Sequence, residues 1–269
     1  MSVDIKNMKS AWFANVQAQR DATLRLFCFP YAGGNTCVFH NWSHDLPFAV
    51  EIYPVQLPGR MQRTREPLIT SMDELIPALE EAILPALDRD FAFYGHSMGA
   101  LIAFELARML GAKHGLEPKH LLVSGRKAPQ LADSISATQG LSDEEFIQHI
   151  RQLNGTPAKV FNNPEMLHFL LPVLRADFEL VQSHRFRDAQ KLSCPIKAFG
   201  GLSDQHVPKN SILPWGETTT GKFSVAMIPG DHFFIQNSRR QFLTLLSAEL
   251  QAVMQVLKSR QYGANLTSR

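Results

Sequence analysis

The stretch FAFYGHSMGALIAFELARML, residues 91–110, decides the fold of this chain. Its first residues are apolar or aromatic, as in a buried strand, and the residues that follow have the pattern of a helix. Gly95, Ser97 and Gly99 form a G-x-S-x-G motif at the point where strand gives way to helix. A tight turn alone would explain the glycines. In this context, however, the motif is typical of a nucleophile elbow, and it predicts that Ser97 presents its hydroxyl for attack.

Short apolar runs alternate with longer helical patterns on both sides of this stretch. Strands are expected at 24–29, 50–56, 91–95, 120–125, 195–201 and 223–228. Helices are expected at 71–87, 99–110 and 238–260. Several of the strands lack clean in/out alternation, as expected for parallel strands that are covered on both faces. The alternation predicts an α/β fold with a mostly parallel, doubly wound sheet.

Residues 131–191 interrupt this alternation, because they contain no convincing strand. They carry two helical patterns, at 141–153 and 163–184. The second is apolar almost all round and includes Phe169 and Leu170, whereas a surface helix needs only one apolar stripe. The helix is therefore either deeply buried or lines an apolar ligand pocket, and the pattern leaves both interpretations open.

Composition excludes several classes of protein. The net charge of +2 is too small for a nucleic-acid-binding protein, which normally carries a marked basic excess. The three cysteines, Cys28, Cys37 and Cys194, are too few and too scattered for a disulfide framework. The first residues lack the apolar core of a secretory signal, and no apolar run approaches the ~18 residues of a membrane span. We expect a soluble, cytoplasmic protein without a membrane or nucleic-acid partner.

A serine hydroxyl needs a base, and the base needs a carboxylate that holds its tautomer. His232 follows the last expected strand, where the chain order Ser–Asp–His of this type of site places the base. Asp204 follows the strand at 195–201 and is the preferred acid. Asp177 lies within the inserted helical segment, and Asp231 adjoins His232 and is badly directed to reach it.

An acyl-transfer site also needs donors for a developing oxyanion. The backbone N–H of Met98, the residue after the nucleophile, is one expected donor, and that of Ala32 in FCFPYAGGNT is the other. This glycine-rich segment lacks the G-K-[ST] and G-x-G-x-x-G patterns of phosphate-binding loops. His40 and His44 have a spacing that suits metal ligands, but no third ligand stands near them, so no metal or other cofactor is expected.

Several motifs together resemble the type II thioesterases, which edit the products of nonribosomal peptide and polyketide synthases. They are FPYAGG, LPGR, YGHSMGA, LPVLRADFELV, GLSDQHV and GDHFF, in the order found in that family. The resemblance covers residues 22–258 and implies an α/β-hydrolase fold in which 131–191 form a helical lid. The terminal segments 1–21 and 259–269 lie outside it and are expected to be loosely ordered.

The resemblance also implies an activity, namely hydrolysis of acyl groups on the phosphopantetheine arm of a carrier protein, or of small acyl thioesters. Ser97, Asp204 and His232 match the catalytic triad of the family, and Ala32 and Met98 match its oxyanion positions. We further expect the substrate to contact Tyr31, Phe169 and Leu170. A medium-chain fatty acyl thioesterase, a carboxylesterase and an acyltransferase on the same fold are the alternatives.

Basic residues after strands suggest where an acidic carrier protein would dock. They are Arg60, Arg63, Arg65, Arg126 and Lys127. The carboxyl-end side of an α/β sheet is where such folds build their sites. Solvated loop charge explains any one of these residues equally well, so both interpretations stand at this point.

Overall fold

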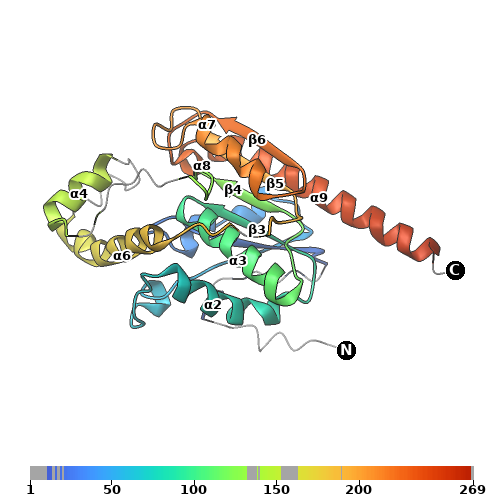
Figure 1. The fold of residues 1–269 in the computed structure, drawn as a ribbon, viewed down its shortest axis with the longest axis horizontal. Helices are drawn as coiled ribbons and strands as arrows, with labels where there is room; N and C mark the ends of the chain where they lie inside the picture. Colours follow the sequence, from blue (N-terminus) through green and yellow to red (C-terminus); the bar gives the residue numbers. More distant parts are fainter. Residues whose placement is uncertain are drawn as a thin grey trace.

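One sheet organises the computed structural model, which describes residues 11–13, 16, 19, 21–131, 138, 140–152, 163–188 and 190–267 (Figure 1). Its strand order is β2-β1-β3-β4-β5-β6, and every neighbouring pair is parallel. The strands are β1 (Leu24–Phe29), β2 (Val50–Pro54), β3 (Phe91–His96), β4 (Leu121–Ser124), β5 (Ile196–Gly201) and β6 (Phe223–Ile228). The chain moves outward from β1 to β2, returns to β3, and then proceeds to β6. The predicted parallel, doubly wound α/β sheet is confirmed.

Helices cover both faces of this sheet. The long ones are α2 (Met72–Ile83), α3 (Met98–His114), α4 (Asp143–Gln152), α6 (Pro164–Ser183) and α9 (Arg239–Thr267). Short α-helical turns are α1 (Trp42–Asp45), α7 (Lys209–Ile212) and α8 (Phe234–Asn237). Short 3₁₀ helices are η2 (Thr36–Phe39), η3 (Met61–Arg63), η4 (Leu84–Ala86) and η5 (Leu213–Thr218).

Alternate residues of β1 show how the two faces are filled. Phe27 and Phe29 pack into the core that α2 and α3 share with the sheet. Leu26 and Cys28 point the other way, into the core beneath α1 and α9. Side chains on successive strand residues alternate between faces, and here both faces are apolar because both are covered. This explains why the strands lack the in/out alternation of a half-exposed sheet.

Local sequence signals account for several helix ends. Ser142 and Glu145 form a reciprocal capping box before α4, in which each side chain accepts a hydrogen bond from the other's backbone N–H. Asn163 caps α6 through its side-chain oxygen, and Pro164 occupies the first turn. The similar spacing at Ser71 produces no side-chain cap, although α2 does begin after it. Pro77 is accommodated within α2, which runs on to Ile83 before the chain tightens into η4.

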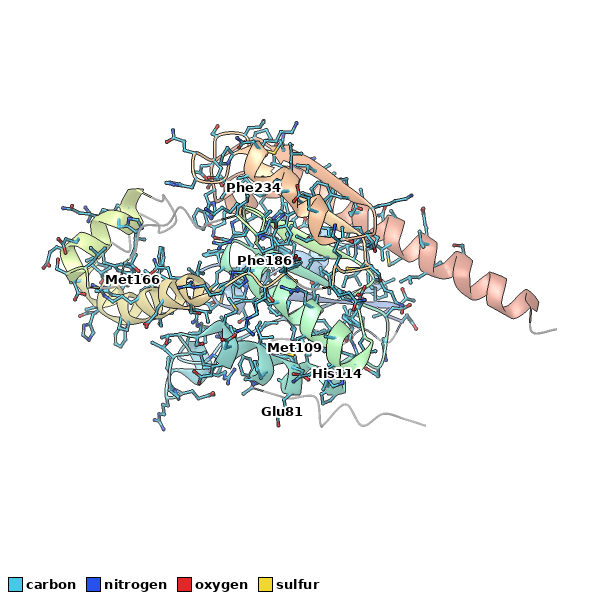
Figure 2. All side chains as sticks on the ribbon, viewed as in Figure 1. Glu81, Met109, His114, Met166, Phe186 and Phe234 are labelled. Atoms are coloured by element: carbon cyan, nitrogen blue, oxygen red, sulfur yellow. The ribbon has the colours of Figure 1, made fainter. Side chains whose placement is uncertain are left out.

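The inserted helix α6 has an outer half, Pro164–Pro172, and an inner half, Val173–Ser183. From Val173 onward most of its side chains are buried, whereas Met166 and Phe169 near its start are exposed. Figure 1 shows α4 and the start of α6 projecting to one side of the sheet, and Figure 2 labels Met166 there. Burial thus explains the apolar residues of the inner half only. Positions 132–137, 139, 153–162 and 189 of the expected lid lie outside the described residues.

The chain before β1 contributes to the core, contrary to the expectation for residues 1–21. Phe13 is buried, forms an antiparallel bridge with Val55 and packs against the rings of Phe27 and Tyr53. The expectation of a loosely ordered segment was wrong for Phe13, because its ring completes the aromatic core that Phe27 and Tyr53 form near the β2 edge. At the other end, α9 continues through residues 259–267, so this stretch is helical.

Candidate active site

Ser97 occupies a strained turn between β3 and α3. Its φ is 53° and its ψ is −112°, a conformation that residues other than glycine rarely adopt. A Cβ on Gly95 would lie 2.1 Å from the carbonyl oxygen of Gly99, and a Cβ on Gly99 would lie 2.1 Å from that of Phe29. Only glycine fits at either position because backbone atoms pass so close. The turn thus has the shape of the expected nucleophile elbow, with the serine at its apex.

His232 and Asp204 are directly paired beyond the ends of β6 and β5. The Nδ1 atom of His232 lies 2.7 Å from Oδ2 of Asp204, whose side chain is fully buried. The other oxygen, Oδ1, accepts hydrogen bonds from the backbone N–H groups of His206 and Val207 at 2.9 and 3.0 Å. Burial alone would raise the pKa of Asp204, but the hydrogen bond with His232 and these backbone donors together lower it. An ionised Asp204 requires a proton on Nδ1, which leaves Nε2 of His232 as the basic nitrogen.

The imidazole of His232 lies beside the elbow. Its ring centroid is 5.3 Å from that of His96, the residue that precedes Ser97. The two other candidate acids have other partners, because Asp231 accepts from the Phe233 N–H and the side chain of Asn237, and Asp177 pairs with Arg60. Among the three acids considered from the sequence, Asp204 is the one that contacts the histidine.

The ring of His96 packs against that of His232 and is itself held by hydrogen bonding. Its Nδ1 lies 2.7 Å from Oγ of Ser124, which also lies 2.7 Å from the hydroxyl of Tyr94. Burial, reinforced by the nearby His232, lowers the pKa of His96 well below its usual value, so the ring is neutral. Gly125 leaves room for it, since a Cβ there would lie 2.5 Å from Cε1 of His96.

The loop after β1, residues 31–34, lies at the same edge of the sheet and is called the glycine loop below. The ring of Tyr31 packs edge-on against Phe233, the neighbour of His232, and its hydroxyl accepts a hydrogen bond from Gln236. Ala32 contacts the apolar cluster of Phe146 and the inner half of α6. Met98 is the first residue of α3, where backbone N–H groups have no acceptor within the helix.

The expected substrate-contacting residues of α6 lie in different places. Leu170 is half-buried and reaches the glycine loop, with its Cδ1 3.5 Å from where a Cβ on Gly33 would lie. Phe169 is 78 % exposed. Leu170 therefore lies against the glycine loop, whereas Phe169 faces solvent, and contact of either residue with the substrate stays a prediction.

Four of the five basic residues expected to dock a partner are buried. Arg60 is 7 % exposed, Arg63 6 %, Arg126 9 % and Lys127 7 %. The expectation of solvent-facing docking charge was wrong for these four, because loop arginines can turn inward where carboxylates and carbonyl oxygens complete their hydrogen bonds. Arg63, for example, donates to Glu66 and to the carbonyl of Gln56. Only Arg65 of the set is exposed.

Sequence reasoning missed the buried pair of Arg60 and Asp177. It joins the loop after β2 to the inner half of α6 through two hydrogen bonds of 2.7 and 2.8 Å. The signal was available in part, because an aspartate within an otherwise apolar helix face needs a buried partner. Its partner, 117 residues away, could not be identified from spacing.

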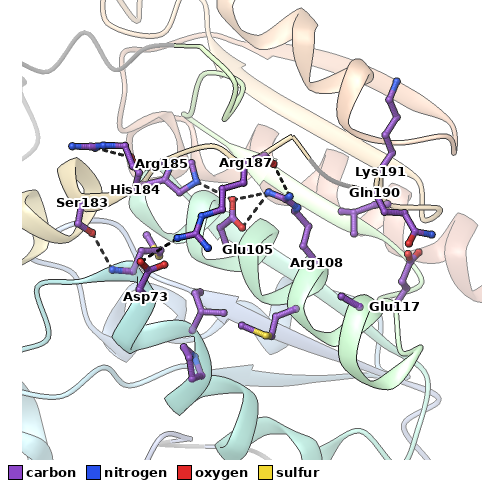
Figure 3. Close-up of a pocket in the computed structure, with 17 residues that line it drawn as sticks. Asp73, Glu105, Arg108, Glu117, Ser183, His184, Arg185, Arg187, Gln190 and Lys191 are labelled. Atoms are coloured by element: carbon purple, nitrogen blue, oxygen red, sulfur yellow. Dashed lines mark hydrogen bonds and ion pairs between the residues drawn. The ribbon is translucent and has the colours of Figure 1, made fainter.

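A cavity of about 410 Å³ lies apart from these residues, between α2, α3 and the chain that follows α6 (Figure 3). Several of its charged lining residues pair with one another. Glu105 pairs with Arg108 and His184, and Arg187 pairs with Asp73. In the described part of the chain, no cluster of three His, Cys, Asp or Glu residues could hold a metal ion. The same residues include no helix that is long and apolar enough to cross a membrane.

Comparison with known protein families matches residues 24–250 to the thioesterase domain. The chain is 44 % identical over 243 residues to the gramicidin S biosynthesis protein GrsT of Aneurinibacillus migulanus, covering 90 % of this chain and 95 % of that protein. It is 36 % identical over 240 residues to thioesterase PikA5 of Streptomyces venezuelae, covering 89 % of this chain and 85 % of the relative.

Solved structures give the same result. RedJ, a thioesterase from the prodiginine biosynthetic pathway in Streptomyces coelicolor, superposes with a TM-score of 0.80 at 37 % identity. The superposition covers 89 % of this chain and 98 % of RedJ.

Proposed function

This chain belongs to the thioesterase family, as a type II thioesterase of nonribosomal peptide and polyketide systems, and we propose that Ser97, His232 and Asp204 are its catalytic triad. We further propose that it hydrolyses acyl groups from the phosphopantetheine arm of a carrier protein. The observation that carries the proposal is the 2.7 Å pairing of His232 with buried Asp204 beside the elbow that presents Ser97.

Acylation begins when Nε2 of His232 accepts the hydroxyl proton of Ser97 as the oxygen attacks the thioester carbonyl. The carbonyl oxygen becomes an oxyanion, which we expect the N–H groups of Met98 and Ala32 to bind. Asp204 keeps Nδ1 protonated and stabilises the imidazolium that forms. When the tetrahedral intermediate collapses, the carbon–sulfur bond breaks, the sulfur takes the proton from His232, and the pantetheine thiol leaves.

Deacylation repeats these steps with water as the nucleophile. His232 accepts a proton from the water as its oxygen bonds to the acyl carbon, and the same two N–H groups bind the second oxyanion. The bond to Oγ of Ser97 then breaks, and the proton on His232 returns to the serine. The products are the free acid and the regenerated enzyme, so the chain's own residues supply every proton transfer.

We also propose which residues contact the substrate. Tyr31 belongs to the glycine loop and Leu170 contacts it, so we expect both to meet the acyl or pantetheine portion of the substrate. Phe169 is exposed on the outer half of α6, so it would contact only a part of the substrate that extends to that surface. Four of the basic residues suggested for docking are buried, so we do not propose them as contacts for the carrier protein.

The test measures hydrolysis of acetyl-, butyryl- and hexanoyl-carrier proteins and the matched N-acetylcysteamine thioesters. Ser97→Ala should lower kcat by several orders of magnitude, and Asp204→Asn should lower it by about 10⁴-fold because it favours the wrong tautomer of His232. Asp231→Asn is the matched control, since it removes the charge next to His232 but keeps an acceptor for the Phe233 N–H.

Two outcomes would sink the proposal. Full activity of folded Ser97→Ala would exclude the serine mechanism, and an Asp231→Asn loss that equals that of Asp204→Asn would exclude Asp204 as the acid. The alternative enzymes predict other products. A carboxylesterase would turn over the matched oxygen ester faster than the thioester. An acyltransferase would hydrolyse little and form product only with an added alcohol or amine.

A further inference from the structure

The carboxylate of Asp177 is buried at the junction of three segments that are far apart in sequence. Its residue is 1 % exposed. Oδ2 accepts hydrogen bonds from Nη1 of Arg60 at 2.8 Å and from the backbone N–H of Gly33 at 2.7 Å, and Oδ1 accepts from Nη2 of Arg60 at 2.7 Å. A side chain of α6 thus holds a backbone amide of the glycine loop.

Arg60 holds the same loop from its other end. Its Nη1 also donates to the carbonyl oxygen of Gly34 at 3.1 Å, and its Nε donates to that of Pro58 at 3.3 Å. Within the loop, the N–H of Gly34 donates to the carbonyl of Tyr31 at 2.8 Å. The peptide before Ala32 is therefore held through the Tyr31 carbonyl, and the peptide after it is held through the Gly33 N–H.

Helix α6 also contacts the glycine loop through its apolar surface. Gly33 has a φ of +74°, and a Cβ there would lie 2.6 Å from Cδ2 of Leu174. Leu174 and Asp177 are three residues apart and therefore share one face of the helix. The end of the Leu174 side chain occupies the space beside Gly33, and the positive φ of Gly33 itself favours glycine. Helix α6 therefore packs directly on the glycine loop.

A buried ion pair of this kind adds little stability compared with apolar residues of the same volume, because both charges lose their hydration. The geometry of Asp177 has a more specific consequence. The peptide after Ala32 is held by Asp177, which accepts from the Gly33 N–H, and the peptide before it is held by the Gly34 N–H, which donates to the Tyr31 carbonyl. Arg60 acts one step away from these peptides, because it donates to Asp177 and to the carbonyl of Gly34. The direction of the Ala32 N–H depends on these peptide planes, and an oxyanion donor acts only when it is aimed within hydrogen-bond distance.

We propose that Asp177 and Arg60 are positioning residues that hold the Ala32 N–H in its oxyanion-binding orientation, so that the inserted helix α6 determines whether the oxyanion site is formed. The inference rests on the proposed function. Neither residue transfers a proton or contacts the reacting carbonyl. Their effect is exerted through the backbone of the glycine loop.

Variants of the two positioning residues should slow the chemical step and leave substrate binding nearly unchanged. Asp177→Asn, Asp177→Ala and Arg60→Met should lower kcat on a small thioester, such as hexanoyl-N-acetylcysteamine, with KM changed by less than about threefold. Complete loss of one oxyanion donor costs about 10²–10³-fold, so a misdirected donor should cost about ten- to hundredfold. Asn at 177 retains an acceptor for the Gly33 N–H, and its loss should be the smallest of the three.

A second readout reports on the oxyanion itself. A trifluoromethyl ketone analogue of the thioester forms a hemiketal when Oγ of Ser97 bonds to its carbonyl carbon, the proton passes to His232 and the oxygen becomes the oxyanion. Its affinity should fall in each variant by about the same factor as kcat. A thioether analogue that lacks the carbonyl forms no oxyanion, so its affinity should not change.

Arg63→Met is the matched control. Like Arg60, Arg63 is a buried arginine of the loop after β2, but it pairs with the carboxylate of Glu66 and its guanidinium stacks on the ring of Trp12. It should destabilise the protein while leaving kcat and ketone affinity unchanged. Arg60→Lys keeps the charge but loses the paired geometry, and it replaces Arg60→Met if that variant does not fold.

Unchanged kcat and ketone affinity in folded Asp177→Asn and Asp177→Ala would overturn the inference, as would equal losses of affinity for the ketone and the thioether. Ser97→Ala is measured alongside these variants. If it retains activity, the proposed function fails; if it is inactive while the Asp177 variants are unaffected, only the positioning role fails.

Discussion

Phe169 and Leu170 show how much one position along a helix changes at the scale of single residues. Both are large and apolar, and no local pattern distinguishes them. Leu170 turns toward the glycine loop, whereas Phe169 faces solvent. Successive residues of a helix point about 100° apart, so one can line a site while its neighbour does not.

This difference predicts unequal effects on chain-length selectivity. Leu170→Asn should raise KM more for hexanoyl and octanoyl thioesters than for acetyl, because each buried CH₂ contributes about 0.8 kcal/mol. Phe169→Asn, the control on the same helix, should change KM little for every chain. The measurement is KM over a series of acyl-N-acetylcysteamines. Equal increases for all chain lengths in Leu170→Asn would show that Leu170 supports the core and does not contact the acyl chain.

The junction of β3 with α3 is the element on which the site depends. At its start α3 passes within a Cβ's reach of the carbonyl of Phe29 in β1, and Gly99 makes that approach possible. Farther along the same helix, a Cβ on Gly111 would meet only the flexible side chain of Glu117, at 3.5 Å. Within one helix, the backbone contact at Gly99 therefore requires glycine, whereas the surroundings of Gly111 would admit a methyl group.

These requirements predict opposite changes in stability. Gly99→Ala should lower the free energy of unfolding by about 1–3 kcal/mol or more, because a backbone segment must shift to admit the methyl group. Gly111→Ala should leave it unchanged or raise it by up to about 1 kcal/mol, since alanine favours a helix more than glycine does. Urea unfolding monitored by circular dichroism gives both values. A Gly99→Ala protein as stable as wild type would contradict the close approach of α3 to β1.

At the scale of the whole molecule, the segment before β1 completes the sheet at the β2 edge. The carbonyl of Trp12 accepts a hydrogen bond from the N–H of Gln56, and the ring of Trp12 lies 4.0 Å from the guanidinium of Arg63. Phe13 inserts beside Phe27 and Tyr53. The thioesterase-domain match begins at residue 24, so the packed unit extends beyond it.

Removal of this contact should therefore destabilise the fold. Phe13→Ala should lower the free energy of unfolding by about 3–5 kcal/mol, the usual loss for a buried phenylalanine. Phe48→Ala removes a ring that is 72 % exposed and should change it by no more than about 0.5 kcal/mol. Urea unfolding of the two variants provides the comparison. Equal, small effects would mean that the segment before β1 adds nothing to the stability of the core.

Signals confined to a few neighbouring residues were sufficient for much of this protein. Strand and helix patterns identified the six strands and the main helices, and the capping residues marked the starts of α4 and α6. The elbow motif placed Ser97, because its two glycines meet a steric requirement that is local to the strand–helix turn. Chain order and strand ends directed the search to Asp204 and His232, which the structure pairs.

Tertiary structure alone decided the features that depend on where distant segments meet. Their position in a loop after a strand suggested that Arg60 and Arg63 are exposed charges, but the fold turns both inward. Arg60, for example, meets the carboxylate of Asp177, 117 residues away. Likewise, no local pattern shows that Phe13 reaches the aromatic core or that Phe169 faces solvent. Periodicity encodes which residues share a face of an element, whereas the path of the whole chain determines what that face contacts. The sequence by itself therefore determined the fold class and the position of the candidate nucleophile, and the packing of α6 on the glycine loop determined how the candidate oxyanion site is held.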